Sequence, residues 1–411
     1  LDLPDGLSEM ETLRHLRSFA DQNANLDEYV SFLGAGAYDH FIPAVVGAIT
    51  SRGEFATAYT PYQPEVSQGT LQAIFEYQSL ICALTDMDVA NASLYDGASA
   101  TAEAALLALN AGKKRDEIVM VGGVHPEYRE TVRTYLTGAS ATCVDAPIDA
   151  STGTTDLDAL RQLVSDRTAG VIVQQPNFYG ALEPTVEIGE IAHAAGALYI
   201  ANVNPISLAL VTPPGAYGAD VVVGEGQPLG NDGAYGGPYL GFFAVTAKLM
   251  RRTPGRLVGE TSDVDGKRAN VLTLRAREQD IRREKATSNI CTNQSLNALA
   301  ACVYMCAMGK QGIQEVADLC LRKAHYLRDR LCELPGVEPA FSAPYFHEFA
   351  LRMPGDMDAT MTALAERGFL GGVPLGRFDA SLSDCALLAV TERRTREEMD
   401  RFVAAVAEVT A

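Results

Sequence analysis

The sequence predicts an α/β protein: a large domain built on a mostly parallel sheet, followed by a small C-terminal α+β domain. Between residues 91 and 245, short β-branched and apolar runs alternate with helical segments of about ten residues. Such alternation is typical of a parallel sheet covered by helices on both faces. The chain has 411 residues, of which 47% are hydrophobic and 21% charged. That is enough to bury one large core and one smaller core.

The first segment, residues 1–60, is expected to form an N-terminal arm and loops. One helix falls within about residues 1–30, and a glycine-rich loop follows at Phe32–His40. Two prolines stiffen the polar segment Tyr59–Gly69. The next segment, Thr70–Thr85, has apolar residues spaced near 3.6, which predicts a helix.

The alternation then places the elements of the large domain, which we expect to span residues 61–330. It predicts strands at 92–95, 117–121, 141–145, 170–174, 198–201, 219–223 and 239–245, and helices at 97–111, 126–137, 157–164 and 186–195. Gly196 suits a left-handed end for the last of these helices. Residues 265–295 are charged and rich in arginine, and residues 296–334 read as largely helical.

The small domain is expected at residues 331–411, after the helix stop at Pro335 and Gly336. Its pattern predicts strands at 348–352, 371–374 and 385–390, with helices at 356–367 and 396–409. A unit of this size is small but within the usual range for a domain.

The composition excludes several kinds of partner. A net charge of −19 argues against nucleic acid and anionic membranes. No apolar run approaches the ~20 residues that span a bilayer, and the acidic start lacks the features of a signal peptide. We therefore expect a cytoplasmic protein. Because the chain starts at Leu1 rather than methionine, we expect a disordered or removed segment before it.

The eight cysteines are scattered and include no CxxC pair. This pattern favours buried, reduced thiols in a cytosolic protein. Cys302 and Cys306 lie four residues apart on a predicted helix, but no histidine or carboxylate has matching spacing. The sequence therefore predicts no metal site.

A strand, a glycine turn and a helix start meet in the segment Ser93–Ala104. Free N–H groups at such a helix start bind phosphate, and Gly97 would allow close backbone approach while Ser99 offers a hydroxyl. The alternative is an ordinary turn with hydroxyl capping. Asp96 weakens the phosphate interpretation, because it sets a negative charge where the phosphate would lie.

From Asn91 to Gly241 the sequence resembles the large domain of a pyridoxal-phosphate (PLP) enzyme, but two required residues are missing. PLP enzymes hold the aldehyde on a lysine and place an aspartate against the pyridine nitrogen. The lysine position falls in Gly224–Gly230 (GEGQPLG), near Pro228, and the nearest downstream lysine is Lys248. The aspartate position falls at Ala201. Two simultaneous losses predict a vacated pocket and no catalytic residue in this chain.

Two further residues are assigned to this vacated pocket. His125 follows the strand at 117–121, where a PLP enzyme often stacks an aromatic ring on the cofactor. A histidine near a strand end is also a common structural cap. Asn177 lies in the segment Gln175–Gly180 (QPNFYG).

The segment Arg282–Asn293 (RREKATSNICTN) is dense in hydrogen-bond donors. It can be a charged helix start with Thr, Ser and Asn caps. It can equally be a cluster of hydroxyls and amides that reaches an anion in a neighbouring subunit. The residues alone leave both interpretations open.

Taken together, these blocks resemble the glycine decarboxylase (P-protein) family of the glycine cleavage system, in particular the subunit 1 (alpha) chains of enzymes split in two. The motifs that carry the resemblance are YTPYQPEVSQG at 59–69, NASLY at 91–95, QPNFYG at 175–180, GEGQPLG at 224–230, GGPYLGFF at 236–243 and RREKATSNICT at 282–292. The resemblance runs along nearly the whole chain. It departs at Tyr95–Ser99, which differs from the LDEGT-like run of single-chain members, and at Asn231–Gly233.

The resemblance implies a fold-type-I PLP-dependent transferase architecture and an α2β2 assembly with a beta subunit (subunit 2) that holds PLP covalently. The implied enzyme decarboxylates glycine, releases CO2 and passes the aminomethyl group to the lipoyl arm of the H-protein. This chain would bind no PLP covalently and would complete its partner's site. The residues expected to face that site are Tyr59, Tyr62, Gln63, Glu65, Thr287, Ser288 and Asn289. The interface is expected to include the Phe32–His40 loop.

Two other function classes remain open from the residues. The chain could be a self-sufficient PLP aminotransferase or lyase that uses an unrecognised lysine. It could also be a regulatory binding module. Internal-aldimine absorbance of the purified chain with PLP separates the first alternative from a subunit that needs a partner.

Overall fold

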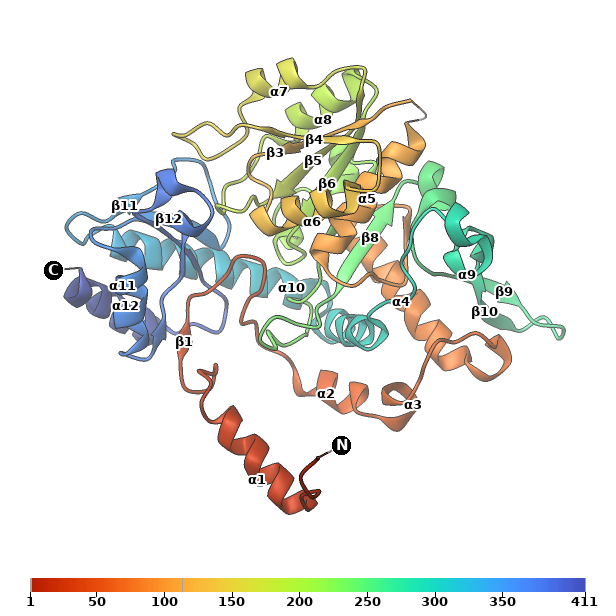
Figure 1. The fold of residues 1–411 in the computed structure, drawn as a ribbon, viewed down its shortest axis with the longest axis horizontal. Coiled ribbons are helices and arrows are strands. Elements are labelled where there is room, and N and C mark those ends of the chain that lie inside the picture. The colour runs from red at the N-terminus through yellow and green to blue at the C-terminus, as the bar shows by residue number, and fades with distance from the viewer. Residues whose placement is uncertain (1, 113, 411) are drawn as a thin grey trace.

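An N-terminal helix, a central sheet with helices on both faces and a C-terminal α+β unit follow one another along the chain in the computed structural model (Figure 1). The structure describes residues 2–112 and 114–410.

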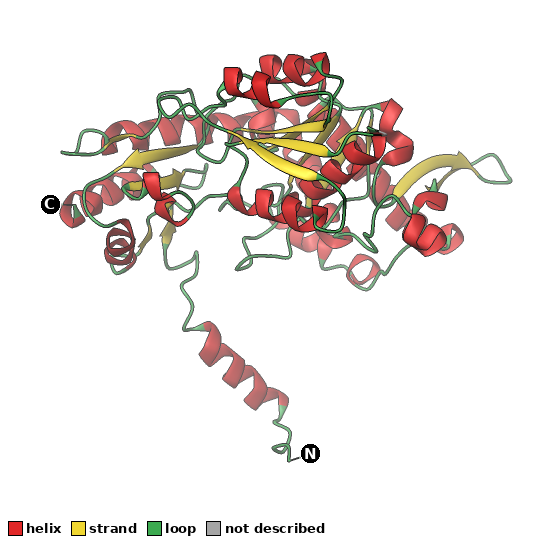
Figure 2. Cartoon of the chain, turned by 45° about the horizontal axis from the view of Figure 1, so that its top comes forward, coloured by secondary structure: helices red, strands yellow, loops and turns green. Residues whose placement is uncertain are grey.

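The N-terminal arm projects away from the rest of the chain in both views (Figures 1 and 2). Its helix α1 (Glu9–Ala20) begins at Ser8 with a capping box to Glu11, and none of its residues is buried. Met10, Leu13 and Phe19 are all exposed by 48% or more. The arm therefore presents exposed apolar side chains.

The central sheet has the order β2-β8-β7-β6-β5-β3-β4. Its strands are β2 (Val89–Ala90), β3 (Glu117–Val121), β4 (Thr142–Ala146), β5 (Thr168–Gln175), β6 (Leu198–Val203), β7 (Val221–Glu225) and β8 (Gly241–Val245). The strands from β7 to β4 run parallel, while β8 is antiparallel to β7 and to β2. The predicted α/β class with a mostly parallel sheet is confirmed.

The strand predicted at 92–95 is wrong. The strand lies earlier, at β2, and only Leu94 forms an isolated bridge with Gly241. Ser93 has φ 102 in the left-handed region, which interrupts extended pairing. Its backbone N–H instead donates to the side-chain Oδ1 of Asn91 at 3.1 Å, which closes a turn.

Helices cover the sheet on both faces, as Figure 2 shows. They include α4 (Gln68–Thr85), α5 (Gly97–Ala111), α6 (Pro126–Leu136), α7 (Leu157–Leu163) and α8 (Thr185–Ala194). The helices α2 (Ala44–Thr50) and α3 (Gly53–Ala56) lie away from the sheet, and α2 packs against the long helix α10 (Ser295–Leu331). The alanine-rich α5 is largely buried because it packs between the sheet and α6. Gly196 has φ 71 just after α8, which confirms the predicted left-handed end.

A hairpin and a long helix follow the sheet. The hairpin pairs β9 (Leu257–Ser262) with β10 (Arg268–Thr273), and the short helix α9 (Gln279–Arg282) comes after it. The long helix α10 (Ser295–Leu331) is interrupted at Gly309, whose φ of 60 is non-helical. Its first half packs in the core of the large unit and its last turns pack in the core of the C-terminal unit.

The C-terminal unit is an antiparallel sheet backed by two helices. Its order is β11-β12-β15-β14, with β11 (Glu338–Pro339), β12 (Glu348–Arg352), β14 (Val373–Pro374), β15 (Cys385–Ala389), α11 (Met357–Ala365) and α12 (Arg396–Val409). The strand predicted at 371–374 is wrong in its bounds. Gly372, with φ 125, separates β14 from β13 (Phe369–Leu370).

The start of the chain also contributes to this C-terminal unit. The short strand β1 (Val30–Ser31) pairs in parallel with β13. The Phe32 ring stacks on Phe402 of α12, with centroids 4.2 Å apart. Residues 30–32 therefore pack with the last eighty residues rather than with the sequence that follows them.

Among the described residues, no helix combines the length and the hydropathy that crossing a bilayer requires.

Candidate functional site

A small cavity lies where β5, β6 and β7 end, the edge at which α/β sheets usually bind ligands. Its wall includes His125, Gln174, Asn202, Glu225, Pro228 and His347. The cavity measures about 30 Å³, which is room for about two water molecules. No lysine among the described residues lines it. These residues do not fit a covalently held PLP.

The carboxyl group of Glu225 lies at the start of α5, the turn at which the sequence left open a phosphate site. Its Oε2 accepts a hydrogen bond from the Gly97 N–H at 2.9 Å, at the start of α5. Its Oε1 accepts from the N–H groups of Gln227 and Leu240, both at 2.9 Å. Burial raises the pKa of Glu225 to about 8, although the three backbone donors act in the opposite direction. The Gly97 N–H at the start of α5 is therefore already paired with a side chain of this protein.

Asp96 and Ser99 close the same helix start with a capping box. The Ser99 N–H donates to Asp96 Oδ1 at 2.7 Å, and the Asp96 N–H donates to Ser99 Oγ at 3.1 Å. A Cβ on Gly97 would lie 2.7 Å from the Tyr128 hydroxyl and 2.9 Å from the Glu225 nitrogen. Of the two interpretations of this turn, the geometry supports capping.

His125 is also a structural cap in this chain. Its Nδ1 accepts from the Glu127 N–H at 3.2 Å at the start of α6, and its Nε2 lies 2.9 Å from the Ala35 carbonyl. Its ring stacks on Tyr128 with centroids 4.8 Å apart. Burial lowers the pKa of His125, so the neutral imidazole suits both contacts. No face of the ring is left for a cofactor on the Tyr128 side.

The other residues assigned to the vacated pocket lie in different surroundings. Pro228 lines the cavity directly. Ala201 is fully buried within β6, and the strand faces the cavity with Asn202 and Val203. The Asn177 amide donates to Gly153 O and to Glu183 Oε1 at 2.8 and 2.7 Å, which makes it part of a buried turn rather than of the cavity wall.

The residues expected to reach a partner are mostly at the surface. Tyr59 is 81% exposed and Tyr62 is 50% exposed, and Gln63, Glu65 and Asn289 are exposed as well. The guanidinium groups of Arg256 and Arg275 lie 5.9 and 5.5 Å from the Tyr62 ring centroid.

Arg256 connects the Tyr59–Gly69 loop with the Arg282–Asn293 segment, where the sequence analysis placed the partner-facing residues. Its Nη2 donates to the Cys291 carbonyl at 2.9 Å, and its Nη1 donates to Asn293 Oδ1 at 3.1 Å. The Tyr62 loop and the 282–293 segment, more than 200 residues apart in sequence, therefore both contact Arg256. We name the surface around Tyr62, Arg256 and Thr287–Asn289 the polar face.

Within the polar face, Thr287 and Ser288 are half-buried. Burial raises the pKa of Glu103 on α5 to about 7, and the neighbouring Ser288 hydroxyl acts in the opposite direction. The Phe32–His40 loop, expected at the interface, is largely taken up within this chain, because Phe32 and His40 are buried.

Two buried carboxyl groups near the cavity were not predicted from the sequence. The first of them, Glu225, is the last residue of β7 and belongs to the GEGQPLG motif at 224–230. Glu348 starts β12 and accepts from the Ala35 N–H at 2.5 Å and the Tyr38 hydroxyl at 2.7 Å. Burial raises the pKa of Glu348 to about 7. These carboxyl groups act on segments more than 100 residues away, so no local spacing signals them.

The comparisons with known proteins agree with this geometry. The family model described as glycine cleavage system P-protein matches residues 1–406. The "probable glycine dehydrogenase (decarboxylating) subunit 1" of Moorella thermoacetica is 56% identical over 100% of this chain and 91% of that protein. The protein of the same name from Carboxydothermus hydrogenoformans is 53% identical over 98% of this chain and 90% of its own length.

Solved structures give the same answer. A crystal structure of glycine decarboxylase (P-protein) in an inhibitor-bound form has a TM-score of 0.94 and 47% identity, covering 100% of this chain and 91% of that one. Glutamate decarboxylase of Lactobacillus brevis has a TM-score of 0.75 at 13% identity, over 100% of this chain and 95% of that one, and so shares the fold alone. The predicted fold-type-I PLP-transferase architecture is confirmed. The chain belongs to the glycine cleavage system P-protein family, among relatives named as subunit 1 of glycine dehydrogenase (decarboxylating).

Proposed function

We propose that this chain is the subunit of a two-chain glycine dehydrogenase (decarboxylating) that does not carry the cofactor. A second subunit holds PLP on its own lysine, and the two form an α2β2 assembly. The enzyme decarboxylates glycine, releases CO2 and passes the aminomethyl group to the lipoyl arm of the H-protein. A cytoplasmic location belongs to the same proposal.

One observation carries this proposal. In a chain of this family, the cavity at the cofactor position is lined by no lysine among the described residues and is closed by the carboxyl group of Glu225. No residue of this chain is therefore assigned a chemical step. The alternative of a self-sufficient PLP enzyme has no structural support at this cavity.

The contribution of this chain to its partner's site comes from the polar face. Thr287 and Asn289 offer a hydroxyl and an amide, and Tyr62 offers a hydroxyl on a loop stiffened by prolines. Such groups bind and orient charged or polar ligands when a rigid scaffold holds them. Arg256 supplies that support by bonding to the backbone at Cys291. Tyr59, Gln63 and Glu65 extend the same surface.

The exposed arm supports the need for a partner. A helix of twelve residues is marginal alone in water, and α1 buries none of its residues in this chain. Its exposed leucines and Phe19 give it an apolar surface to bury in an obligate complex, whose interfaces cover roughly 2,000–5,000 Å².

The test is co-expression with a candidate subunit 2, followed by size-exclusion chromatography and a glycine–bicarbonate exchange assay. We expect exchange only when both chains are present with PLP and lipoylated H-protein. Exchange by this chain alone, or a stable monomer that ignores subunit 2 at micromolar concentration, would refute the proposal.

A further inference from the structure

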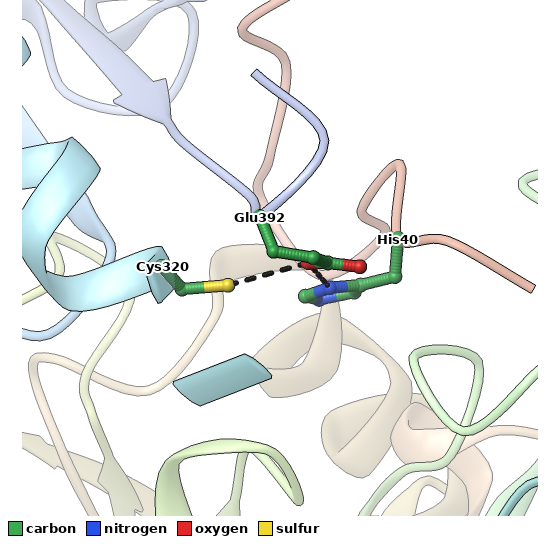
Figure 3. A group of neighbouring side chains, drawn as sticks. All are labelled: His40, Cys320 and Glu392. Carbon is green, nitrogen blue, oxygen red and sulfur yellow. Dashed lines mark hydrogen bonds and ion pairs between the residues drawn. The ribbon is translucent and has the colours of Figure 1, made fainter. Parts of the chain in front are cut away.

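Three side chains with different metal-binding atoms meet where the N-terminal arm joins the C-terminal unit (Figure 3). His40 comes from the loop after β1, Cys320 from α10, and Glu392 from the segment between β15 and α12. Their nitrogen, sulfur and oxygen atoms all lie within 4.8 Å of one another. Cys320 is fully buried, and the side chains of His40 and Glu392 are 2% and 9% exposed.

The distances inside this cluster are close to those of a zinc site. Glu392 Oε2 lies 2.7 Å from His40 Nδ1 and 3.4 Å from Cys320 Sγ. Zinc takes nitrogen and oxygen at about 2.0–2.2 Å and thiolate sulfur at about 2.3 Å in a tetrahedron, which sets its ligand atoms roughly 3.4–3.6 Å apart. The sulfur–oxygen pair already has this spacing. The His40–Glu392 pair would widen by about 0.7 Å when a cation replaces the proton it shares.

Beside the cluster, two further histidine ring nitrogens are buried and unpaired among the described residues, and neither is the His40 Nδ1 that faces Glu392. His347, 1% exposed, lies beside His40 with ring centroids 6.0 Å apart. His347 Nδ1 and His40 Nε2 are buried nitrogens without a hydrogen-bond partner among the described residues. Buried polar atoms left unpaired in this way are rare in folded proteins and indicate an unseen partner such as a water molecule.

We propose that His40, Cys320 and Glu392 form a binding site for a zinc-like divalent cation, which ties the N-terminal arm loop to α10 and to the C-terminal unit. A water molecule completes the coordination. On binding, the cation displaces the thiol proton of Cys320 and the proton shared by His40 and Glu392. The thiolate and the carboxylate then balance the two positive charges.

The surroundings suit a structural rather than a catalytic ion. The cluster lies outside the cavity at the ends of β5 to β7, and Glu392 Oε1 accepts from the Phe41 N–H at 2.6 Å. Cys320 Sγ donates to Glu392 Oε2 at 3.4 Å, which is the contact of a protonated thiol. Metal binding must therefore release a proton that can be measured.

The experiment uses the full chain, treated with chelator and titrated with Co²⁺ in place of Zn²⁺. We expect one cobalt per chain, a thiolate-to-cobalt charge-transfer band, proton release, and displacement by Zn²⁺. Cys320→Ser and His40→Ala should each weaken binding by at least about a hundredfold, more than the 10- to 100-fold cost of losing a residue that only orients a ligand. The matched control is Cys332→Ser at the end of the same helix, which should bind as the wild type does.

The circular dichroism and melting temperature of each metal-free variant show whether it is folded, and Cys320→Ala provides a second variant at the sulfur position. The proposal is overturned if the wild-type chain shows no stoichiometric cobalt band, or if the band persists unchanged in folded Cys320→Ser or Cys320→Ala protein.

Discussion

Glu225 Oε2 accepts a hydrogen bond from the Gly97 N–H at 2.9 Å, which joins the end of β7 to the start of α5 across 128 residues of sequence. This contact turns a helix start that could hold a phosphate into a closed structural joint. The same carboxyl group also accepts from Gln227 and Leu240. It therefore fixes the turn in which a PLP enzyme would carry its lysine.

Replacing Glu225 with alanine should destabilise the chain strongly. The change leaves three buried backbone N–H groups without an acceptor, and each such loss costs about 1–3 kcal/mol. We expect the free energy of unfolding to fall by about 3 kcal/mol or more in urea titrations, with a smaller loss for Glu225→Gln, which keeps one acceptor oxygen. Glu187→Ala on the exposed side of α8 is the control. Equal stability of Glu225→Ala and the control would show that the joint contributes little.

The raised pKa of Glu225 also predicts a pH dependence. A carboxyl group whose folded pKa is about 8, against 4.5 when exposed, binds more protons in the folded state between these values. Its contribution to stability is therefore complete below pH 4.5 and is lost as the pH rises through 8. We expect the stability of the wild type relative to Glu225→Gln to fall across this window. If the stability difference between the wild type and Glu225→Gln stays constant or rises with pH, the three backbone donors keep the Glu225 carboxylate ionised.

Thr287 and Ser288 should affect cofactor affinity in the assembled enzyme. If their hydroxyls donate to the PLP phosphate of subunit 2, losing a hydrogen bond to a charged group costs about 1.5–3 kcal/mol. The Thr287→Ala/Ser288→Ala double variant should then bind PLP roughly 10- to 150-fold more weakly. PLP titration of the reconstituted complex measures this, with Thr292→Ala as the control. Unchanged PLP affinity would contradict a role of these hydroxyls in binding the PLP phosphate.

Tyr62 and Gln63 should affect turnover rather than cofactor affinity. Their groups lie on an exposed loop stiffened by prolines, and such a loop suits orientation of glycine or of the lipoyl arm more than proton transfer. We expect Tyr62→Phe and Gln63→Ala in this chain to raise KM or lower kcat of the complex while PLP affinity stays the same. Val66→Ala, on the same loop and 80% exposed, is the control. Wild-type kinetics in both variants would show that the Tyr59–Gly69 loop has only a structural role.

Local signals explain which elements could be predicted from the sequence. Helix α12 matches its predicted range, 396–409, because Thr395 and Glu398 form a capping box that the sequence displays. The buried strand β3 also matches its predicted range, 117–121. The strand predicted at 92–95 was wrong because Ser93 adopts a left-handed conformation. Nothing in the local sequence indicates that conformation for a serine within an apolar run.

The candidate site was harder to predict because its key contacts join distant segments. The GEGQPLG motif contains no lysine, which the sequence shows directly, but the contact of Glu225 in the same motif depends on Gly97 lying beside it. His40, Cys320 and Glu392 show no mutual spacing in the chain, so only the fold brings them together. The bond from Arg256 to Cys291, which supports the polar face, is another contact of this kind.

The central claim is that the cofactor belongs to the partner and not to this chain. The direct measurement is borohydride reduction of the reconstituted complex with PLP, followed by separation of the two chains and peptide mapping by mass spectrometry. We predict a stoichiometric pyridoxyl-lysine on subunit 2 and none on this chain. A stoichiometric pyridoxyl group on any lysine of this chain would contradict the account.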